Sequence, residues 1–218
     1  MSSIKLKHSG GNAVSLHPPT SAPSSSDVQF KLPTADGSNG QVLQTDGSGN
    51  LSWVTLPTPG ITEADQWRVT ADFTMNSQYA ATITSNWERN DTTFDKIGTG
   101  MSVDGNGHFT FPSTGIWLIQ VHWTGARSSG STHWGIHYAY GMTDGVQSNG
   151  FEIMKSYVGN SANNGRNTAF MQAMFDVQNT SGYKVLFGYY DNMVQTTVYK
   201  GSSSTNENSY TFIKLGET

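Results

Sequence analysis

The chain has 218 residues and a formal net charge of -4 at pH 7, which suits one domain with an additional segment. Only 13% of its residues are charged, and this excludes the basic surface that nucleic-acid binding requires. No run of roughly 18 apolar residues is present, so we expect no membrane insertion. The absence of cysteine excludes disulfides, thiolate metal sites and a cysteine nucleophile.

The composition favours an all-β fold. Glycine, serine, threonine and asparagine are abundant, lysine and glutamate are scarce, and 25 of the residues are aromatic (6 Trp, 9 Tyr and 10 Phe). Aromatic and β-branched residues suit strands, and glycine and asparagine suit turns, whereas helix surfaces are usually rich in Ala, Leu, Glu and Lys. We therefore expect almost no helix.

Residues 1–60 form a first segment, called the arm here. Its apolar residues are sparse and isolated, and residues 21–26 (SAPSSS) resemble a linker, so the arm cannot bury enough surface to fold alone. Residues 27–32 and 41–45 have a strand-like pattern. The second of these is followed by a DGSGN turn and the strand-like residues 51–54, which predicts a short β-hairpin. We expect an extended arm that gains its core from a partner.

The sequence LPTPG at residues 56–60 ends the arm, because two prolines and a glycine interrupt any strand. Residues 61–218 are called the head here. Short strands separated by turn residues recur along it, a pattern that predicts a sandwich or barrel. The expected strands are residues 67–73, 79–86, 100–103, 107–111, 115–123, 132–140, 150–157, 168–177, 183–190, 193–200 and 209–215.

Two of these strands have apolar residues on both faces, 116–123 and 183–190. A sandwich strand in a monomer usually has one polar face, and no helix is expected to cover the second face, so other subunits are the natural cover. The alternative is burial in the sandwich core of a single subunit. The residues predicted to lie in a trimer interface or core are Trp117, Ile119, Val121, Trp123, Phe187 and Tyr189.

One stretch of the head resembles the C1q/TNF-like family. Residues 94–98 (FDKIG) are followed by residues 107–117 (GHFTFPSTGIW), which are similar to the family's GxFxxPxxGxY signature, with Trp117 where tyrosine is usual. The resemblance covers about residues 67–216. It implies a C1q/TNF-like jelly-roll sandwich that forms a homotrimer and binds ligands through loops and strand ends. The family is diverse in function, so it does not specify the ligand.

The arm has a resemblance of its own. Residues 40–53 (GQVLQTDGSGNLSW) and residues 4–11 (IKLKHSGG) are similar to stretches of tail-fibre and other virion proteins of phages of marine cyanobacteria. This resemblance implies a short fibre or capsid decoration that contacts other virion proteins through residues 1–60. The N-terminus lacks the apolar segment of a secretory signal, so we expect assembly in the host cytoplasm and a final location in the virion.

Residues 133–140 (HWGIHYAY) are the most suggestive stretch for ligand contact. Alternation places His133 and His137 on one strand face and Trp134, Ile136, Tyr138 and Tyr140 on the other. The aromatic rings of the second face could stack on sugars, and a place in a trimer or sandwich core is the favoured alternative for them. The candidate contacts for a host-surface glycan or receptor are His133, His137, Trp134 and Tyr138. Two histidines on one face could also bind a metal, but no carboxylate lies nearby in sequence, and we predict neither a metal nor another cofactor.

The remaining motifs predict no catalytic chemistry. The loops that begin at Asp46 and Asp104 do not match a calcium-binding loop and are interpreted as hairpin turns. No nucleophile elbow, HExxH motif or P-loop is present, and we expect no enzyme activity. The prediction is therefore a homotrimeric phage structural protein whose head contacts the host surface. A soluble C1q-like lectin and, less favoured, a polysaccharide depolymerase stay open as alternatives.

Overall fold

The computed structural model describes residues 4–24, 28–56, 60–75, 81–127, 133–160, 165–191 and 197–218. Contacts divide the chain into two compact units, Met1–Pro59 and Gly60–Thr218, so the arm and the head are described separately. In these ranges the regular structure consists of strands and one short 3₁₀ turn, η1 (Gln147–Asn149). No helix in the described part of the chain is long and apolar enough to cross a membrane. The predicted all-β fold is confirmed.

The arm contains two antiparallel hairpins: β1 (Ile4–Lys7) with β2 (Ala13–Leu16), and β3 (Gln41–Thr45) with β4 (Leu51–Thr55). The second hairpin was predicted. The Asp46 carboxylate closes its turn by accepting hydrogen bonds from the backbone N–H groups of Ser48 (2.7 Å) and Asn50 (3.1 Å). The first hairpin was not predicted. The predicted strand at 27–32 was wrong over its described residues, where only an isolated bridge of Lys31 forms.

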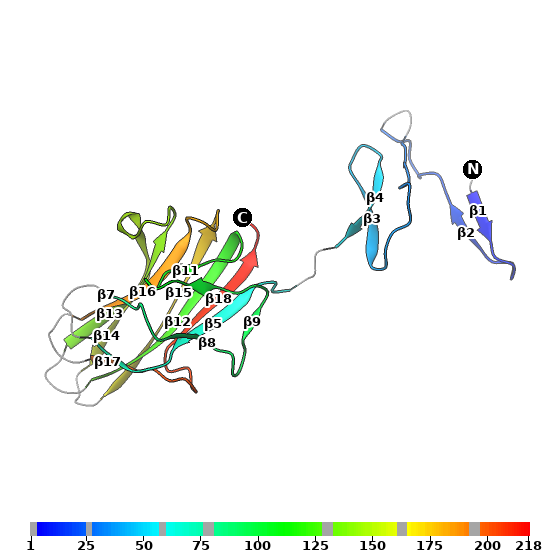
Figure 1. Ribbon diagram of the computed structural model, residues 1–218. Helices are drawn as coiled ribbons and strands as arrows, with labels where there is room; N and C mark the ends of the chain where they lie inside the picture. Colours follow the sequence, from blue (N-terminus) through cyan, green and yellow to red (C-terminus); the bar gives the residue numbers. More distant parts are fainter. Residues whose placement is uncertain are drawn as a thin grey trace. The chain divides into compact units, whose positions relative to one another are not determined.

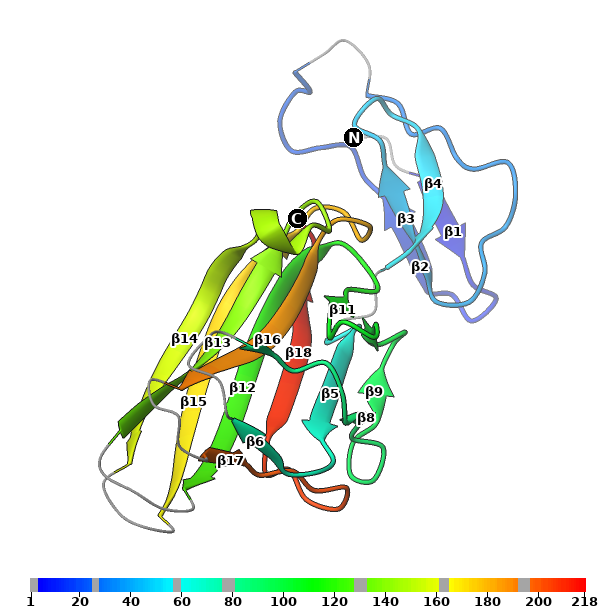
Figure 2. The same cartoon turned by 60° about the vertical axis from the view of Figure 1, so that its left-hand side comes forward.

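One sheet of the head is built around the long strand β12 (Gly115–Arg127). On one side β12 pairs with β15 (Arg166–Val177), and on the other side it pairs with β18 (Ser209–Gly216) and β17 (Thr197–Tyr199). Figure 2 shows β12, β18 and β5 next to one another. The remaining strands of this sheet are β5 (Ala64–Val69), β6 (Phe73–Met75), β8 (Trp87–Arg89) and β9 (Lys96–Ile97).

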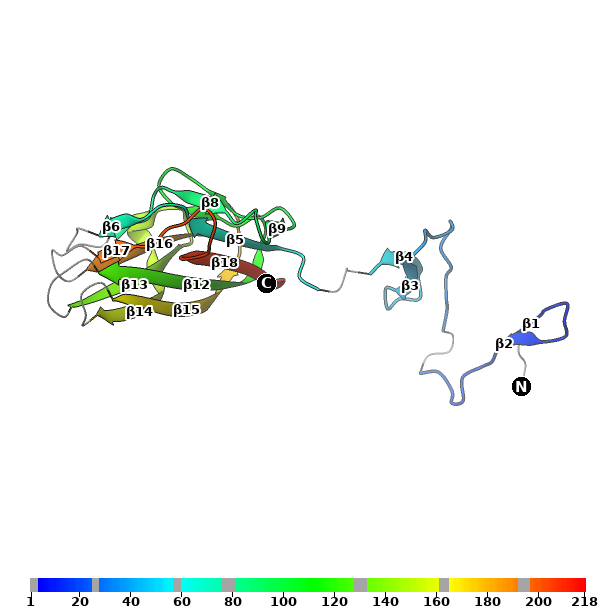
Figure 3. The same ribbon diagram turned by 90° about the horizontal axis from the view of Figure 1, so that it is seen from below.

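The second sheet has β16 and β13 at its centre. Its order is β10-β11-β16-β13-β14, and β7 pairs with β16. Neighbours that are far apart in sequence, such as β11 and β16, give the head the crossed connections of a jelly roll (Figure 1). Figure 3 shows β6 and β17 at one end of the head and β9 towards the other. The strands of the second sheet are β7 (Ala81–Thr82), β10 (Ser102–Val103), β11 (Phe109–Thr110), β13 (His133–Met142), β14 (Phe151–Asn160) and β16 (Lys184–Asp191).

The core lies between the two sheets and is dominated by aromatic rings. Phe109 is fully buried, and its ring centroid lies 4.9 Å from that of Trp87 and 5.3 Å from that of Phe212. Alternation along β12 turns every second side chain into this core. Of the six residues predicted to lie in a trimer interface or core, five are buried within a single subunit: Trp117, Ile119, Val121, Trp123 and Phe187. The sixth, Tyr189, is partly buried and packs against the same core.

Several predicted strands differ from the observed ones at their ends. β5 begins at Ala64 rather than at residue 67, and β12 continues to Arg127. Of the predicted strand 79–86, residues 81–82 form β7, while 79–80 lie outside the described residues. β8 and β9 were not predicted. The missed parts are short or carry charged residues, so they lack a period-two apolar pattern.

Candidate functional site

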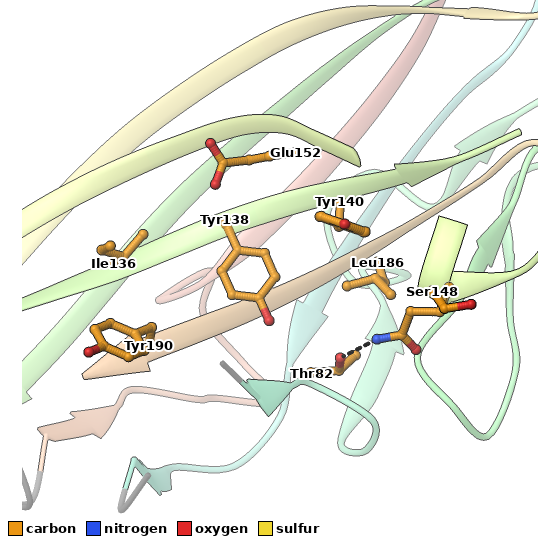
Figure 4. Close-up of a pocket in the computed structure, with 9 residues that line it drawn as sticks. Thr82, Ile136, Tyr138, Tyr140, Ser148, Glu152, Leu186 and Tyr190 are labelled. Atoms are coloured by element: carbon orange, nitrogen blue, oxygen red, sulfur yellow. Dashed lines mark hydrogen bonds between the residues drawn. The ribbon is translucent and has the colours of Figure 1, made fainter. Parts of the chain in front are cut away.

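The outer face of the second sheet contains a pocket with a volume of about 640 Å³. It lies over β13 and β16, on the side of the sheet that faces away from the core. Figure 4 shows Ile136 and Tyr190 at one end and Ser148 at the other. Among the described residues, the lining consists of Thr82, Ile136, Tyr138, Tyr140, Gln147, Ser148, Glu152, Leu186 and Tyr190.

Strand register produces the floor of this pocket. β13 and β16 are antiparallel partners, with Ile136 opposite Tyr190 and Tyr140 opposite Leu186. Between these two pairs, Tyr138 lies opposite Gly188. Residues that share a face and lie directly opposite one another are in contact range, so the alternating residues of both strands form one continuous apolar surface.

A β-bulge brings a carboxylate to the same face. β13 and β14 pair as Ala139 with Met154, and the register then shifts so that Tyr140 lies opposite Glu152. The extra residue, Ile153, packs against the core. Without the shift, Ile153 would lie opposite Tyr140 and Glu152 would point to the other side of the sheet. The bulge therefore directs an acidic side chain towards a tyrosine, a use that bulges often have near binding sites.

Two glycines allow the tyrosine rings to lie close to the sheet. A Cβ atom at Gly188 would overlap the Tyr138 hydroxyl, and one at Gly150 would overlap the Tyr140 ring. The Tyr138 hydroxyl donates to the backbone carbonyl of Ala81 at 3.3 Å. Burial raises the pKa of Tyr138, so this hydroxyl keeps its proton at neutral pH. Both ring positions are thus fixed by local packing.

Polar side chains surround the apolar floor. Gln147 donates from Nε2 to the Thr82 hydroxyl at 3.4 Å, as the dashed line in Figure 4 shows, and its Oε1 lies 3.3 Å from Nε2 of His108. Glu152 forms an ion pair with Lys155 at 2.8 Å. Glu152 supplies the one carboxylate among the described lining residues, whereas most glycosidases use a pair of carboxylates.

The predicted ligand contacts separate into different environments. Tyr138 lines the pocket, but His137 points to the opposite side of the strand and is fully buried. His137 Nδ1 lies 2.7 Å from the Tyr199 hydroxyl, and its Nε2 lies 3.4 Å from that of Tyr210. A ligand in solvent cannot reach His137, so its prediction as a contact was wrong. The side chains of His133 and Trp134 lie outside the described residues.

Sequence reasoning missed most of the pocket. Alternation places Tyr140 on the strand face of Tyr138, and Tyr190 on the face of Leu186, but neither tyrosine was predicted to contact a ligand. Glu152 could not have been found in this way, because the bulge interrupts the alternation. Gln147, Ser148 and Thr82 lie in or beside turns, where the sequence has no periodic signal.

Burial of His137 predicts a pH dependence of stability. Burial lowers the pKa of His137 from 6.5 to about 3. Between these values the unfolded chain binds a proton that the folded chain does not, so stability falls as the pH drops, by up to about 1.4 kcal/mol per pH unit. From about pH 7 to about pH 5 we expect the native chain to lose about 2 kcal/mol more than His137→Gln, which cannot titrate.

Urea unfolding of both chains, at equal protein concentration and at both pH values, measures this difference. Carboxylates titrate alike in the two chains, so their contribution to the loss of stability cancels when the two chains are compared. An equal loss of stability in the native chain and in His137→Gln would contradict the neutral, buried state of this histidine.

The outer face of the other sheet exposes two large apolar side chains to solvent. Phe170 and Met174 of β15 are 58% and 69% exposed. Pairing places them opposite His122 and Leu118 of β12, and Ile213 of β18 lies on the other side of Leu118. This set of residues, Leu118, His122, Phe170, Met174 and Ile213, is called the β15 face here. The polar pair Gln120 and Gln172 lies between the Phe170 and Met174 positions, so the face has two apolar groups with a polar strip between them. Exposed apolar side chains gathered in this way often mark a contact with another protein.

No cluster of three or more His, Asp or Glu side chains that could hold a metal ion occurs in the described ranges. The loop at Asp104 is a tight turn, as expected: its carboxylate accepts hydrogen bonds from the backbone N–H groups of Asn106 and His108 at 2.9 and 3.0 Å. These two bonds, together with the charges of His108 and Lys184, outweigh partial burial and lower the pKa of Asp104.

Comparisons with known proteins identify the fold of the head. No protein-family profile and no curated protein matches the sequence. A solved structure of the TNF protein Eiger from S. frugiperda is similar over 73% of this chain and 96% of its own, with a TM-score of 0.54 and 12% identity. Murine APRIL at pH 8.0 is similar over 70% of this chain and 98% of its own, with a TM-score of 0.50 and 10% identity. The head therefore has a TNF-like jelly-roll fold.

Proposed function

We propose that this chain is the subunit of a homotrimeric appendage of a bacteriophage particle, a short fibre or decoration. In this proposal the arm attaches to other virion proteins and the head points outward to the host surface. The role is structural and involves no enzymatic reaction. The observation that carries the proposal is the β15 face, where large apolar side chains are exposed on a sheet whose other side already packs on the core.

The β15 face has the character of a contact between copies of one chain. Its large apolar side chains lie on regular strands of one sheet, in which β12 pairs with β15 on one side and with β18 on the other. Between Phe170 and Met174, the Gln120 amide donates to Gln172 at 3.1 Å across the two strands, so this polar pair satisfies part of its own hydrogen bonding. Aromatic residues and methionine are enriched in subunit interfaces. The C1q/TNF resemblance supports three copies rather than two.

The arm supports attachment to a larger assembly. In the β1–β2 hairpin, Ile4 lies opposite Leu16 and Leu6 opposite Val14, so four apolar side chains share one face. All four are at least 64% exposed. A two-stranded hairpin is marginally stable alone, and a partner that covers this face would stabilise it. The resemblance of residues 40–53 to phage virion proteins supports a virion protein as that partner.

Analysis of purified phage particles tests the proposal. We expect mass spectrometry of the virions to detect the chain, and imaging of particles labelled through the C-terminus to place the label on the tail or on the capsid surface. Native mass measurement of the isolated full chain should give three copies. Absence of the chain from virions would refute the appendage role, and a monomeric mass at micromolar concentration would refute the trimer.

A further inference from the structure

We propose that the pocket over β13 and β16 binds a neutral sugar unit of a glycan. The pocket and its chemistry are properties of the head alone, and the host-surface role of such a glycan rests on the function proposed above. The apolar floor, the polar rim and the fixed positions of the tyrosines each point to this ligand class.

The floor matches the apolar side of a sugar ring. A pyranose presents C–H groups on one face and hydroxyl groups around its edge, and an aromatic ring packs well against the C–H face. Tyr138, Tyr140 and Tyr190 bring three aromatic rings to one concave surface, and Leu186, which is 1% exposed, lies at its base. Figure 4 shows the Tyr138 ring in the middle of this surface, with Ile136 to one side and Leu186 to the other.

The rim matches the hydroxyl groups of a sugar. Glu152 supplies a carboxylate acceptor, Gln147 an amide, and Ser148 a hydroxyl, all on exposed side chains around the floor. Carboxylate and amide groups form directional hydrogen bonds with neighbouring hydroxyls, and hydrogen bonds that involve a charged group are the stronger ones. A few polar groups around an apolar floor are the usual composition of a small-molecule site.

Charge favours a neutral ligand. The Glu152 carboxylate is paired with the Lys155 ammonium at 2.8 Å, so the pair has no net charge. A sialylated or uronic-acid sugar would bring its own carboxylate close to that of Glu152. The Lys155 ammonium beside the pocket is already paired with Glu152, and the described lining residues include no further lysine or arginine that could neutralise an acidic sugar.

The site is already arranged without a ligand. Gly188 and Gly150 leave the space in which the Tyr138 and Tyr140 rings lie against the sheet, and the bulge holds Glu152 on the same face. Ordering these side chains therefore reduces the binding free energy only a little. The pocket and the β15 face lie on the outer sides of opposite sheets, so the proposed trimer leaves three pockets open, and weak binding at each becomes effective through multivalency.

The test uses the full chain on a glycan array. The array contains oligosaccharides of neutral hexoses and N-acetylhexosamines, together with their sialylated and uronic-acid counterparts. We expect binding to neutral glycans, followed by a Kd for the best one from calorimetry. Tyr138→Ala should weaken this binding at least about tenfold through loss of ring contact. Glu152→Gln, at an exposed side chain that folding does not require, should weaken it about tenfold.

Phe94→Ala is the matched control, because Phe94 is a 43% exposed aromatic residue of the head that does not line the pocket. It should bind like the native chain. Binding confined to acidic glycans, or unchanged in both pocket variants, would overturn the inference. The inference would also be overturned if the chain bound peptides instead of glycans and both pocket variants lost that peptide binding. If the chain has the mass of a trimer but binds no glycan, the proposed glycan site is refuted and the proposed assembly is not.

Discussion

The double variant Phe170→Ser/Met174→Ser is expected to convert the proposed trimer into a folded monomer. Both side chains are more than half exposed in one subunit, so replacing them removes little from the head's own core. Full burial of a Phe or Met side chain contributes about 1.5–3 kcal/mol. A trimer buries each of these positions three times, so serine at both removes a large part of the association free energy.

Light scattering over a range of concentrations measures the change, and circular dichroism checks that the head stays folded. A suitable control is Phe94→Ser/Val146→Ser, which replaces two apolar residues of similar exposure, 43% and 46%, outside the β15 face. This control should remain trimeric. A double variant at the β15 face that stays trimeric would show that another surface joins the subunits.

Replacing Asp65 by alanine is expected to destabilise the head by about 3–5 kcal/mol. The Asp65 carboxylate is fully buried and accepts hydrogen bonds from Arg89 Nε (3.0 Å), Trp67 Nε1 (2.9 Å) and the backbone N–H of Met101 (2.7 Å). Alanine leaves all three donors without this acceptor, in a place that water reaches poorly. The Arg89 side chain is 26% exposed, which places the expected loss at the lower end of the range.

Denaturant unfolding measures this loss, with Asp65→Asn and Asp72→Ala for comparison. Asp65→Asn keeps the volume and one acceptor, so its loss should be intermediate. Asp72 has a side chain that is 42% exposed and binds Lys200 and the backbone N–H of Gly201. Its removal should cost at most about 1 kcal/mol. If Asp65→Ala loses no more than Asp72→Ala, the buried network does not stabilise the head in this way.

Much of the fold could be predicted because most of its strands alternate cleanly. In β12 every second residue from Trp117 to Trp123 is large and apolar, so the presence of the strand and the division of its residues into two faces follow from the sequence alone. β5 was placed three residues late because Asp65, near its start, is charged yet buried. The Asp65 carboxylate accepts a hydrogen bond from Arg89 Nε at 3.0 Å, and this pairing allows a charge inside the fold. A sequence pattern records the charge but not its partner.

The candidate site was predicted only in part. Tyr138 was selected because it shares a strand face with other aromatic residues, and it lines the pocket. His137 was selected because alternation places it on one strand face with His133, and it is buried beside Tyr199 instead. Glu152 joins the site through a shift in strand register, and Gln147 joins it through a turn. Pairing between strands determines both, and the chain order of the residues does not reveal it.

The sequence by itself determined that the head is all-β, where most of its strands lie, and which residues of each strand share a face. Tertiary structure decided which of the two faces of a strand is covered by the second sheet. In β12 that face is the one with Trp117 and Ile119, and in β13 it is the one with His137, which leaves Tyr138 and Tyr140 outside. The physical reason is that alternation along a strand defines two faces equally well, and only packing against a distant strand makes one of them the core.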